Sequence, residues 1–201
     1  MTDPLQTAID AALISGRIQV DSLNTDFGIH HKGEINLVTD VDIACQSAII
    51  SVIKDRFPDD DIIAEEKPND FKGERNRWII DPVDGTTNYA HGYPFFCTSI
   101  AYAESGKVTV GVVYNPVMNE LFFASRGKGA YLNGVKIAVS PIDQLKRSLL
   151  STGFPYDIAI NPDNNIDHFI TFLFEAQAVR RDGSAALNLS YVACGRFDGF
   201  W

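Results

Sequence analysis

Residues 78–89 read WIIDPVDGTTNY, and this stretch decides the fold and the site that we expect. Its apolar start, Trp78 to Ile80, predicts a buried strand that ends in Asp81. A proline-directed turn then brings a second acid, Asp84, and a glycine, Gly85, before two threonines. The stretch therefore predicts two carboxylates at the end of a rigid strand, followed by the start of a helix.

These residue types indicate metal and phosphate chemistry. Carboxylates held this close raise each other's pKa unless a cation lies between them, and a dense set of hard oxygen ligands suits Mg²⁺. Backbone NH groups from Gly85 to Thr87 would point at an anion if they begin a helix. The alternative is purely structural, with Asp81 and Asp84 as turn formers and Thr86 as a helix cap.

Further acids stand at the ends of other predicted elements. Glu65 and Glu66 follow a strand-like run, and Asp42 lies in the first turn of a predicted helix. Three element ends thus present carboxylates, which favours the functional interpretation over the structural one. The spacing matches neither an EF-hand loop, nor a Walker A motif, nor a complete GxGxxG fingerprint.

The composition is that of an ordinary globular chain without a basic surface. The chain has 201 residues, of which 45% are apolar, and its formal net charge is -9. The acidic balance argues against nucleic acid or an acidic membrane as partner, because such surfaces require clustered Lys and Arg. The three cysteines form no CxxC pair, which suits free thiols in the cytoplasm. We expect a soluble cytoplasmic protein without an export signal or a membrane span.

Hydrophobic periodicity predicts a layered α/β fold. Two amphipathic helices are expected first, one behind Asp3-Pro4 and one that begins at Thr39 or Asp40 and ends before Pro58, with a loop over 21–36 between them. Strand-like runs follow at residues 61–64, 78–81, 96–103, 108–114, 120–124 and 129–132. A strand at 148–151 and helices at 166–178 and 184–194 complete the pattern.

This order of elements predicts two lobes. Residues 1–140 should form an N-terminal α+β lobe with an antiparallel-rich sheet, which carries the metal site. Residues 141–201 should form a smaller C-terminal α/β lobe.

Three segments together resemble the inositol monophosphatase family. They are WIIDPVDGTTNY at 78–89, AEE at 64–66 and GSAALNLSYVACGRFDGFW at 183–201, and the order and spacing resemble the family along nearly the whole chain. The resemblance implies the layered α/β fold shared with sugar bisphosphatases, Mg²⁺ as cofactor, lithium sensitivity and usually a homodimer.

The resemblance also implies a set of metal ligands. Glu65 and Asp81, with the backbone carbonyl of Val83, would hold a first Mg²⁺. Asp81 and Asp84 would share a second one, and Glu65 would reach a third ion through water. Bound metal lowers the pKa of water and neutralises phosphoryl oxygens, so that no covalent intermediate is needed.

The catalytic and substrate-binding residues follow from the same resemblance. Thr86 would pair with Asp42 to orient the attacking water, with Glu65 as the third catalytic residue. The residues expected to contact the substrate are Asp84, Gly85, Thr86, Gly183, Ser184 and Ala185. A structural role for Ser184 as a helix cap is compatible with this assignment. Arg180 and Arg181 precede that turn and either reach the substrate or a dimer partner, or are simply solvated.

The expected function is Mg²⁺-dependent hydrolysis of a small phosphate monoester, with inositol monophosphate as the first candidate. The sequence leaves open histidinol phosphate, fructose 1,6-bisphosphate and phosphoadenosine phosphate. It also leaves open a non-catalytic relative that keeps the fold as a dimerising module. The acid cluster favours the enzyme, because an interaction module has no need for mutually repelling carboxylates.

Members of the family continue beyond the position that matches Trp201. In the family an acid that contacts the substrate follows almost directly, and a Trp-Asp pair further on completes the second metal site. Neither has a counterpart in this sequence. We therefore expect a fragment of a longer protein, with weak hydrolysis of its own and an unpaired sheet edge.

Overall fold

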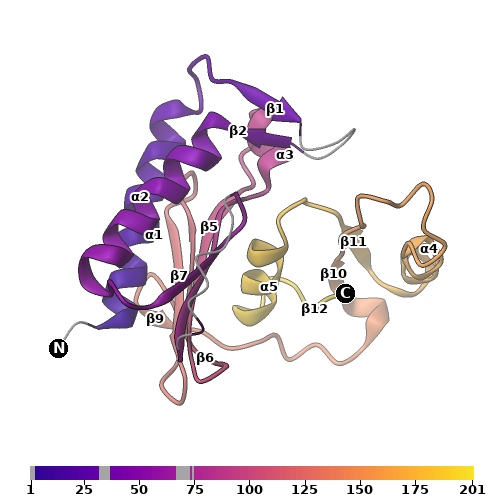
Figure 1. Ribbon diagram of the computed structural model, residues 1–201. Helices are drawn as coiled ribbons and strands as arrows, with labels where there is room; N and C mark the ends of the chain where they lie inside the picture. The colour runs from indigo at the N-terminus through magenta and orange to yellow at the C-terminus, as the bar shows by residue number, and fades with distance from the viewer. Residues whose placement is uncertain (1–2, 32–36, 67–72, 74) are drawn as a thin grey trace.

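The computed structural model describes residues 3–31, 37–66, 73 and 75–201. Within these residues the chain forms two sheets with helices on their faces and between them (Figure 1). A separate two-stranded ribbon lies at one end. The layered α/β fold expected from the sequence is confirmed.

The larger sheet has seven strands in the described part of the chain, and they follow one another in sequence order. The strands are β3 (Asp61–Ala64), β4 (Asn76–Asp84), β5 (Cys97–Glu104), β6 (Lys107–Asn115), β7 (Glu120–Ser125), β8 (Gly129–Leu132) and β9 (Val135–Lys136). All neighbours are antiparallel except β3 and β4, which run parallel. Ser105-Gly106 and Asn133-Gly134 have positive φ at both positions, and this conformation closes tight hairpins with the right twist.

Helices α1 (Pro4–Ser22) and α2 (Asp40–Arg56) cover one face of this sheet. As predicted, α1 begins behind Asp3, whose side chain accepts a hydrogen bond from the NH of Leu5. The core beneath the helices contains Trp78, which is fully buried and donates its indole NH to Asp60 at 3.1 Å. Truncation of such a side chain to alanine costs about 3 to 5 kcal/mol, so this core dominates the stability of the first sheet.

The predicted loop over 21–36 is partly wrong. Residues Ile29–His31 form strand β1, which pairs antiparallel with β2 (Leu37–Thr39), while residues 32–36 lie outside the described residues. A hydrogen-bonded pair, His30 and Asp40, ties this ribbon to the start of α2 at 2.8 Å. Three-residue strands with a polar face give little periodicity, which is why the sequence pattern did not show them.

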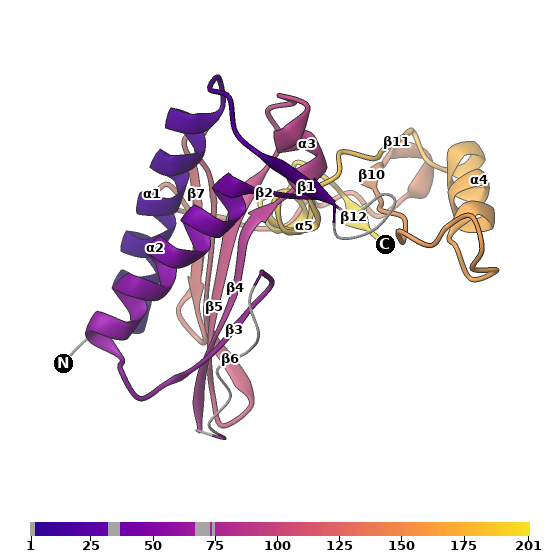
Figure 2. The same cartoon turned by 45° about the horizontal axis from the view of Figure 1, so that its top comes forward.

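The smaller sheet is parallel and has β10 (Leu149–Ser151) at its centre, with β11 (Ala178–Arg180) and β12 (Gly199–Phe200) on either side. A short 3-10 turn, η1 (Leu145–Arg147), leads into it. Helix α4 (Ile166–Glu175) packs outside β11, and α5 (Ala185–Ala193) lies between the two sheets (Figures 1 and 2). The helix expected at 166–178 ends at Glu175, because Ala178 enters the smaller sheet.

Helix α5 joins the two sheets through one hydrophobic cluster. Leu187 and Tyr191 of the helix pack against Cys97 and Phe122 of the larger sheet and against Phe197 before β12. The predicted lobe boundary at 140/141 falls in the segment between β9 and η1, which has no regular structure. The two sheets therefore share one hydrophobic cluster through α5.

Trp201 closes the smaller sheet against α4. Its indole NH donates to Asn165 at 2.6 Å, and its ring lies 4.5 Å from that of Phe172. The hydroxyl of Thr152 donates to the carbonyl oxygen of Trp201 at 2.8 Å. No helix among the described residues combines the length and the apolar character that a membrane crossing requires.

Candidate active site

A bulge in β4 brings the two acids of the DPVD segment to one side of the sheet. Asp81 pairs with Ser99 and Asp84 with Cys97, so β4 holds one residue more than β5 over this interval. Residues three apart in a regular strand point to opposite faces, and the extra residue resets that alternation. Pro82 fits the bulge, because it has no NH to contribute to the ladder.

Glu65 reaches the same place through the parallel pairing of β3 and β4. Ala64, the last residue of β3, pairs with Ile80, so Glu65 leaves β3 beside Asp81, which is still part of β4. The NH of Glu66 donates to the side-chain carbonyl of Gln46 at 2.9 Å, which fixes the chain where it leaves β3. The sequence pattern predicted Glu65 and Asp81 at strand ends but did not indicate the contact with Gln46.

The acids border a small polar cavity of about 90 Å³. It is lined by Glu65, Asp81, Val83, Asp84, Gly85, Thr86, Thr87, Tyr156 and Gly183. The cavity thus collects seven of the ten different residues that were predicted as site residues. Asp42 lies behind Thr86, Ser184 lies behind Asp84, and Ala185 is exposed beyond Ser184.

Asp81 is a buried acid surrounded by other acids, which makes its ionised form unfavourable. Its Oδ1 atom is buried and has no hydrogen-bond partner among the described residues. Burial, followed by the charges of Asp84, Glu65 and Asp42, raises the pKa of Asp81 well above the usual aspartate range. A buried oxygen of this kind is normally satisfied by a donor or a cation, and the surrounding charges favour a cation.

Asp42 and Thr86 form the pair that the sequence predicted. The Thr86 hydroxyl lies 3.1 Å from Oδ1 of Asp42 and 3.0 Å from the carbonyl oxygen of Val83, and its single hydrogen can serve only one of them. The other carboxylate oxygen, Oδ2, accepts from the NH of Thr39 at 2.9 Å and from the Thr39 hydroxyl, which completes a capping box at the start of α2. Burial raises the pKa of Asp42.

Gly85 opens the short helix α3 (Thr86–Ala90) and can be no other residue. Its φ of +106° lies in the left-handed region, and a Cβ atom there would meet the carbonyl oxygen of Phe95 at 3.0 Å. The backbone of Gly85 and Thr86 can therefore come close to whatever fills the cavity. Figure 2 shows α3 and the β1–β2 ribbon at the same end of the larger sheet.

The turn before α5 is held against α3. The Asn88 side-chain amide donates to the carbonyl oxygens of Phe95 and Asp182, each at 2.7 Å. A Cβ atom on Gly183, which has φ of +87°, would meet that amide at 3.0 Å. This close approach explains the glycine and places Gly183 at the cavity wall.

Asp84 binds the first turn of α5. Its Oδ2 accepts from the Ser184 hydroxyl at 2.7 Å and from the NH of Ala186 at 2.6 Å. The Ser184 oxygen is also the helix cap, since it accepts from the NH of Leu187 at 3.4 Å. The predicted helix cap at Ser184 is confirmed, its hydroxyl proton is donated to Asp84, and its predicted contact with the substrate stays a prediction.

The oxygen atoms around the cavity are of the kind that binds a hard cation, but the acidic side chains do not converge on one point. In the described part of the chain, no three His, Cys, Asp or Glu side chains converge closely enough to hold a metal ion. Glu65, Asp81, Asp84 and Val83 nevertheless surround one cavity with oxygen atoms, and the unpartnered Oδ1 of Asp81 is an oxygen that a cation would satisfy. Mg²⁺ keeps several waters, so it can complete such a set.

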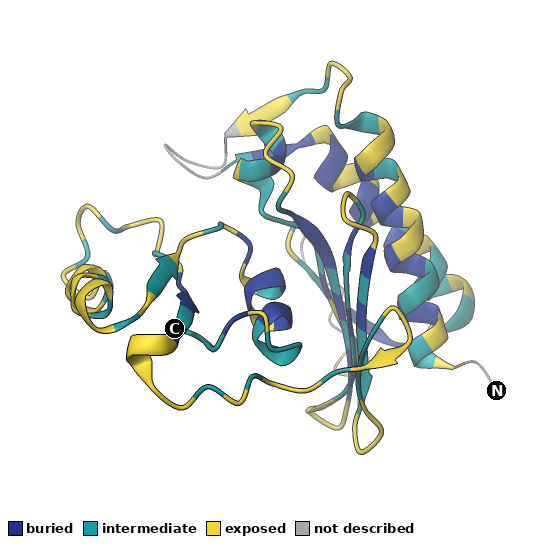
Figure 3. Cartoon of the chain, turned by 180° about the vertical axis from the view of Figure 1, so that it is seen from behind, coloured by how far each residue is buried: buried dark blue, intermediate teal, exposed yellow. Residues whose placement is uncertain are grey.

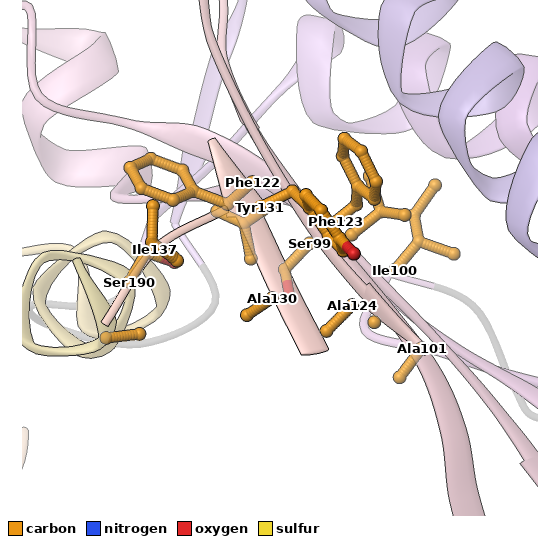
Figure 4. A pocket seen from close by; sticks show the side chains of 14 residues that line it. Ser99, Ile100, Ala101, Phe122, Phe123, Ala124, Ala130, Tyr131, Ile137 and Ser190 are labelled. Carbon is orange, nitrogen blue, oxygen red and sulfur yellow. The ribbon is translucent and has the colours of Figure 1, made fainter. Parts of the chain in front are cut away.

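A second, larger cavity of about 240 Å³ lies on the other half of the same sheet face, beside α5 (Figure 4). It is hollow because a row of small residues crosses the sheet, with Ala101, Gly111, Ala124 and Ala130 paired in register. Tyr131 is the sole titratable residue in its wall. The smaller, polar cavity is therefore the candidate active site.

Tyr156 is a cavity residue that sequence reasoning missed. It follows β10 in a loop whose Phe154 ring packs against Phe169 at 5.4 Å and beneath the guanidinium of Arg181 at 5.8 Å. Arg181 is thereby engaged in the smaller lobe. No local pattern could have linked residue 156 to residue 81, because their proximity depends on how the two sheets meet.

The layered α/β fold and an acidic, cation-compatible cavity at the ends of two strands define the class of protein as a phosphatase of phosphate monoesters. The chain belongs to the inositol monophosphatase family, whose sequence model, described as "Inositol monophosphatase family", matches residues 1–201. Phosphoric monoester hydrolysis is the activity that this membership supports.

Individual relatives agree with this assignment. The chain is 44% identical to inositol-1-monophosphatase of Synechocystis over 201 residues, which cover 98% of the chain and 69% of the relative. Its fold matches the extragenic suppressor protein suhB of Bartonella henselae with a TM-score of 0.92 at 35% identity, over 98% of this chain and 76% of that one. An IMPase/NADP phosphatase whose structure contains Mg²⁺ and phosphate matches with a TM-score of 0.79 at 28% identity, over 97% and 74%.

Proposed function

We propose that this chain hydrolyses small phosphate monoesters with Mg²⁺ as cofactor, and that inositol monophosphate is its preferred substrate. The observation that carries the proposal is the buried Oδ1 of Asp81, which has no donor among the described residues and faces a ring of negative charge. An ionised carboxylate in this position is unfavourable without a counter-charge, and a divalent cation would turn it into a ligand.

The chain's residues take distinct parts in the proposed reaction. Asp81 and Glu65, with the Val83 carbonyl, would hold a first Mg²⁺, and Asp81 and Asp84 a second. Bound Mg²⁺ supplies charge neutralisation at the phosphoryl oxygens and a more acidic water. The backbone of Gly85 and Thr86 lines the cavity where the phosphoryl group would lie, and Gly183 lies in the cavity wall, where the polyol would pass.

Asp42 and Thr86 would orient the attacking water. When the Thr86 hydroxyl donates to Asp42, its lone pairs remain to accept a hydrogen bond from water in the cavity. The capping box that fixes Asp42 keeps this pair in place, since Thr39 holds the other carboxylate oxygen. The protein thus contributes positioning and charge, and no covalent intermediate is required.

A substrate panel tests the proposal. Phosphate release would be measured with inositol 1-phosphate, histidinol phosphate, fructose 1,6-bisphosphate and phosphoadenosine phosphate, each with Mg²⁺ and with a chelator. We expect release only with Mg²⁺ and the highest kcat/KM with inositol 1-phosphate. Unchanged rates in chelator would contradict the metal requirement, and no release from any ester would favour the non-catalytic alternative.

Three further properties belong to the proposal. Li⁺ should inhibit at millimolar concentration, because a small monovalent ion can replace Mg²⁺ at the site shared by Asp81 and Asp84. The protein should be a homodimer in the cytoplasm, with the lobes divided near residues 140 and 141. Inhibition curves, light scattering, cell fractionation and limited proteolysis check these points separately.

A further inference from the structure

The two aspartates of the DPVD segment differ in what they bind. Asp81 has a buried oxygen without a donor, whereas Oδ2 of Asp84 accepts two hydrogen bonds from the start of α5. The donors come from Ser184 and Ala186, about one hundred residues further along the chain. One proposed cation ligand is therefore oriented by the other lobe.

The Ser184 hydroxyl occupies a central place in this contact. Its proton goes to Asp84, and its oxygen accepts the NH of Leu187. Ser184 is only 1% exposed. The Cys97 sulfur lies next to this hydrogen bond, 3.6 Å from the Ser184 oxygen and 3.9 Å from Oδ2 of Asp84. Buried hydrogen bonds to a charged group have strong directional effects, so the plane of the carboxylate is fixed by this contact.

We infer that Ser184 is a positioning residue that orients the Asp84 carboxylate for a divalent cation. With Oδ2 held by Ser184 and Ala186, Oδ1 is the oxygen that can turn towards the cavity that Asp84 lines. Ser184 thus acts on the cation through Asp84, in addition to any contact that its turn makes with the substrate. The inference rests on the proposed function, because it concerns the proposed cation.

The far end of α5 is anchored to the larger sheet as well. Oε2 of Glu120 accepts from the Tyr191 hydroxyl at 3.0 Å, and Oε1 accepts from Arg196, whose guanidinium lies 4.6 Å from the centre of the Tyr191 ring. Helix α5 is therefore held at both ends by residues of the larger sheet. By linkage, a cation that binds an oriented Asp84 must in turn stabilise the docking of α5.

The experiment compares two serines of the same helix segment. Ser184→Ala removes the hydrogen bond to Asp84, and Ser190→Ala is the matched control, because the Ser190 hydroxyl donates only within the helix, to the carbonyl oxygen of Ala186. Mg²⁺ affinity is measured by calorimetry, and amide exchange of residues 185–193 is measured with and without Mg²⁺. Ser184→Gly is the second variant, because glycine at a helix cap is tolerated better than alanine and also lacks the hydroxyl.

We expect Ser184→Ala and Ser184→Gly to weaken Mg²⁺ binding by roughly 10 to 100-fold, as is usual for residues that orient a ligand. Mg²⁺ should protect the amides of α5 in the wild type but much less in these variants, and Ser184→Thr should restore both properties. Wild-type affinity in the two hydroxyl-free variants, or an equal loss in Ser190→Ala, would overturn the inference alone. No Mg²⁺ binding by the wild type would overturn the proposed function first.

Discussion

The two sheets bury their residues in different ways. The larger sheet has strands of up to nine residues and a core closed by α1 and α2, whereas the strands of the smaller sheet are two or three residues long. Every residue of α4 is described and none is buried, and Phe174 is 83% exposed (Figure 3). The larger lobe can therefore be stable through its own core, whereas the smaller lobe depends on α5 and its polar contacts with the first.

The chemistry follows the same division. Asp42, Glu65, Asp81 and the α3 turn all belong to the larger lobe, and the smaller lobe adds Tyr156, Gly183 and the donors that hold Asp84. Under the proposed function, the metal ligands would come from the larger sheet, and residues after β10 would orient them and contact the substrate. The following predictions test this separation, starting with the largest effect.

Asp81→Asn should reduce kcat more than 100-fold, since the loss of a direct metal ligand exceeds the roughly 10 to 100-fold usual for its supporting residues. Phosphate release at saturating Mg²⁺ measures this effect. Asp59→Asn is the matched control, because Asp59 is an exposed acid outside the cavity. Equal rates for the wild type and Asp81→Asn would remove the metal site from the larger lobe.

Glu120→Gln should loosen the attachment of α5 without disturbing the larger sheet. The substitution removes the charge that pairs with Arg196 at a site that is 10% exposed on the Glu120 side, and we expect a loss of about 1 to 3 kcal/mol. Hydrogen exchange should become faster in α5 and stay unchanged in α1 and α2. Uniform acceleration over both lobes would show that the lobes unfold as one unit.

The metal-free protein should lose stability as the pH rises above about 4. Because burial and neighbouring acids raise the folded pKa of Asp81 above its ordinary value of 3.8, the native state retains a proton that the unfolded state has released. Asp81→Asn should reduce this slope, to which Asp42 with its raised pKa also contributes, and near neutral pH it should raise the free energy of unfolding by about 1 kcal/mol or more, or roughly 2 to 4 °C in Tm. Thermal melts in chelator across this pH range measure it.

Asp84→Asn should stabilise the metal-free protein less than Asp81→Asn does. The sequence alone suggests that Asp84→Asn stabilises the metal-free protein, because it removes one member of a like-charged cluster. The structure shows that Asp84 also accepts two hydrogen bonds from α5, which an amide would satisfy less well. Asp81→Asn is therefore the better stabilising substitution, and a larger gain from Asp84→Asn would contradict this view of the site.

Tyr156→Ala should have the smallest effect, a rise of about 3 to 10-fold in KM for inositol 1-phosphate with kcat nearly unchanged. Tyr156 contributes an exposed ring at the cavity wall and no charge, so it can pack against a sugar ring but not assist the chemistry. Steady-state kinetics of Tyr156→Ala and of the control Tyr93→Ala test this. A fall of 100-fold in kcat would give the smaller lobe a catalytic part.

Local sequence patterns predicted most of the fold and the acids of the site. The strand at Trp78 to Asp81, the helix cap at Thr39 and the helix start at Ser184 were predicted correctly, because each signal lies within a few residues. The strand end expected at Asp81 was wrong, since β4 continues to Asp84, and the expected burial holds for Trp78 and Ile80 but not for the exposed Ile79. The short strand β1 and the early end of α4 were missed, since tertiary pairing decides both. The bulge, the Asp84–Ser184 contact and Tyr156 depend on packing between distant segments, which no local pattern encodes.

The two tryptophans of the chain divide between the lobes, and this gives each lobe its own optical signal. Trp78 is fully enclosed in the larger core, 4.7 Å from the ring of Tyr102, whereas Trp201 is partly open to water beside Phe172. Trp78 should emit at shorter wavelength than Trp201, because its surroundings are apolar and dry. In Trp201→Phe the tryptophan fluorescence would report only the surroundings of Trp78, and in Trp78→Phe only those of Trp201. Different midpoints in the two thermal melts would show that the two parts of the chain unfold separately.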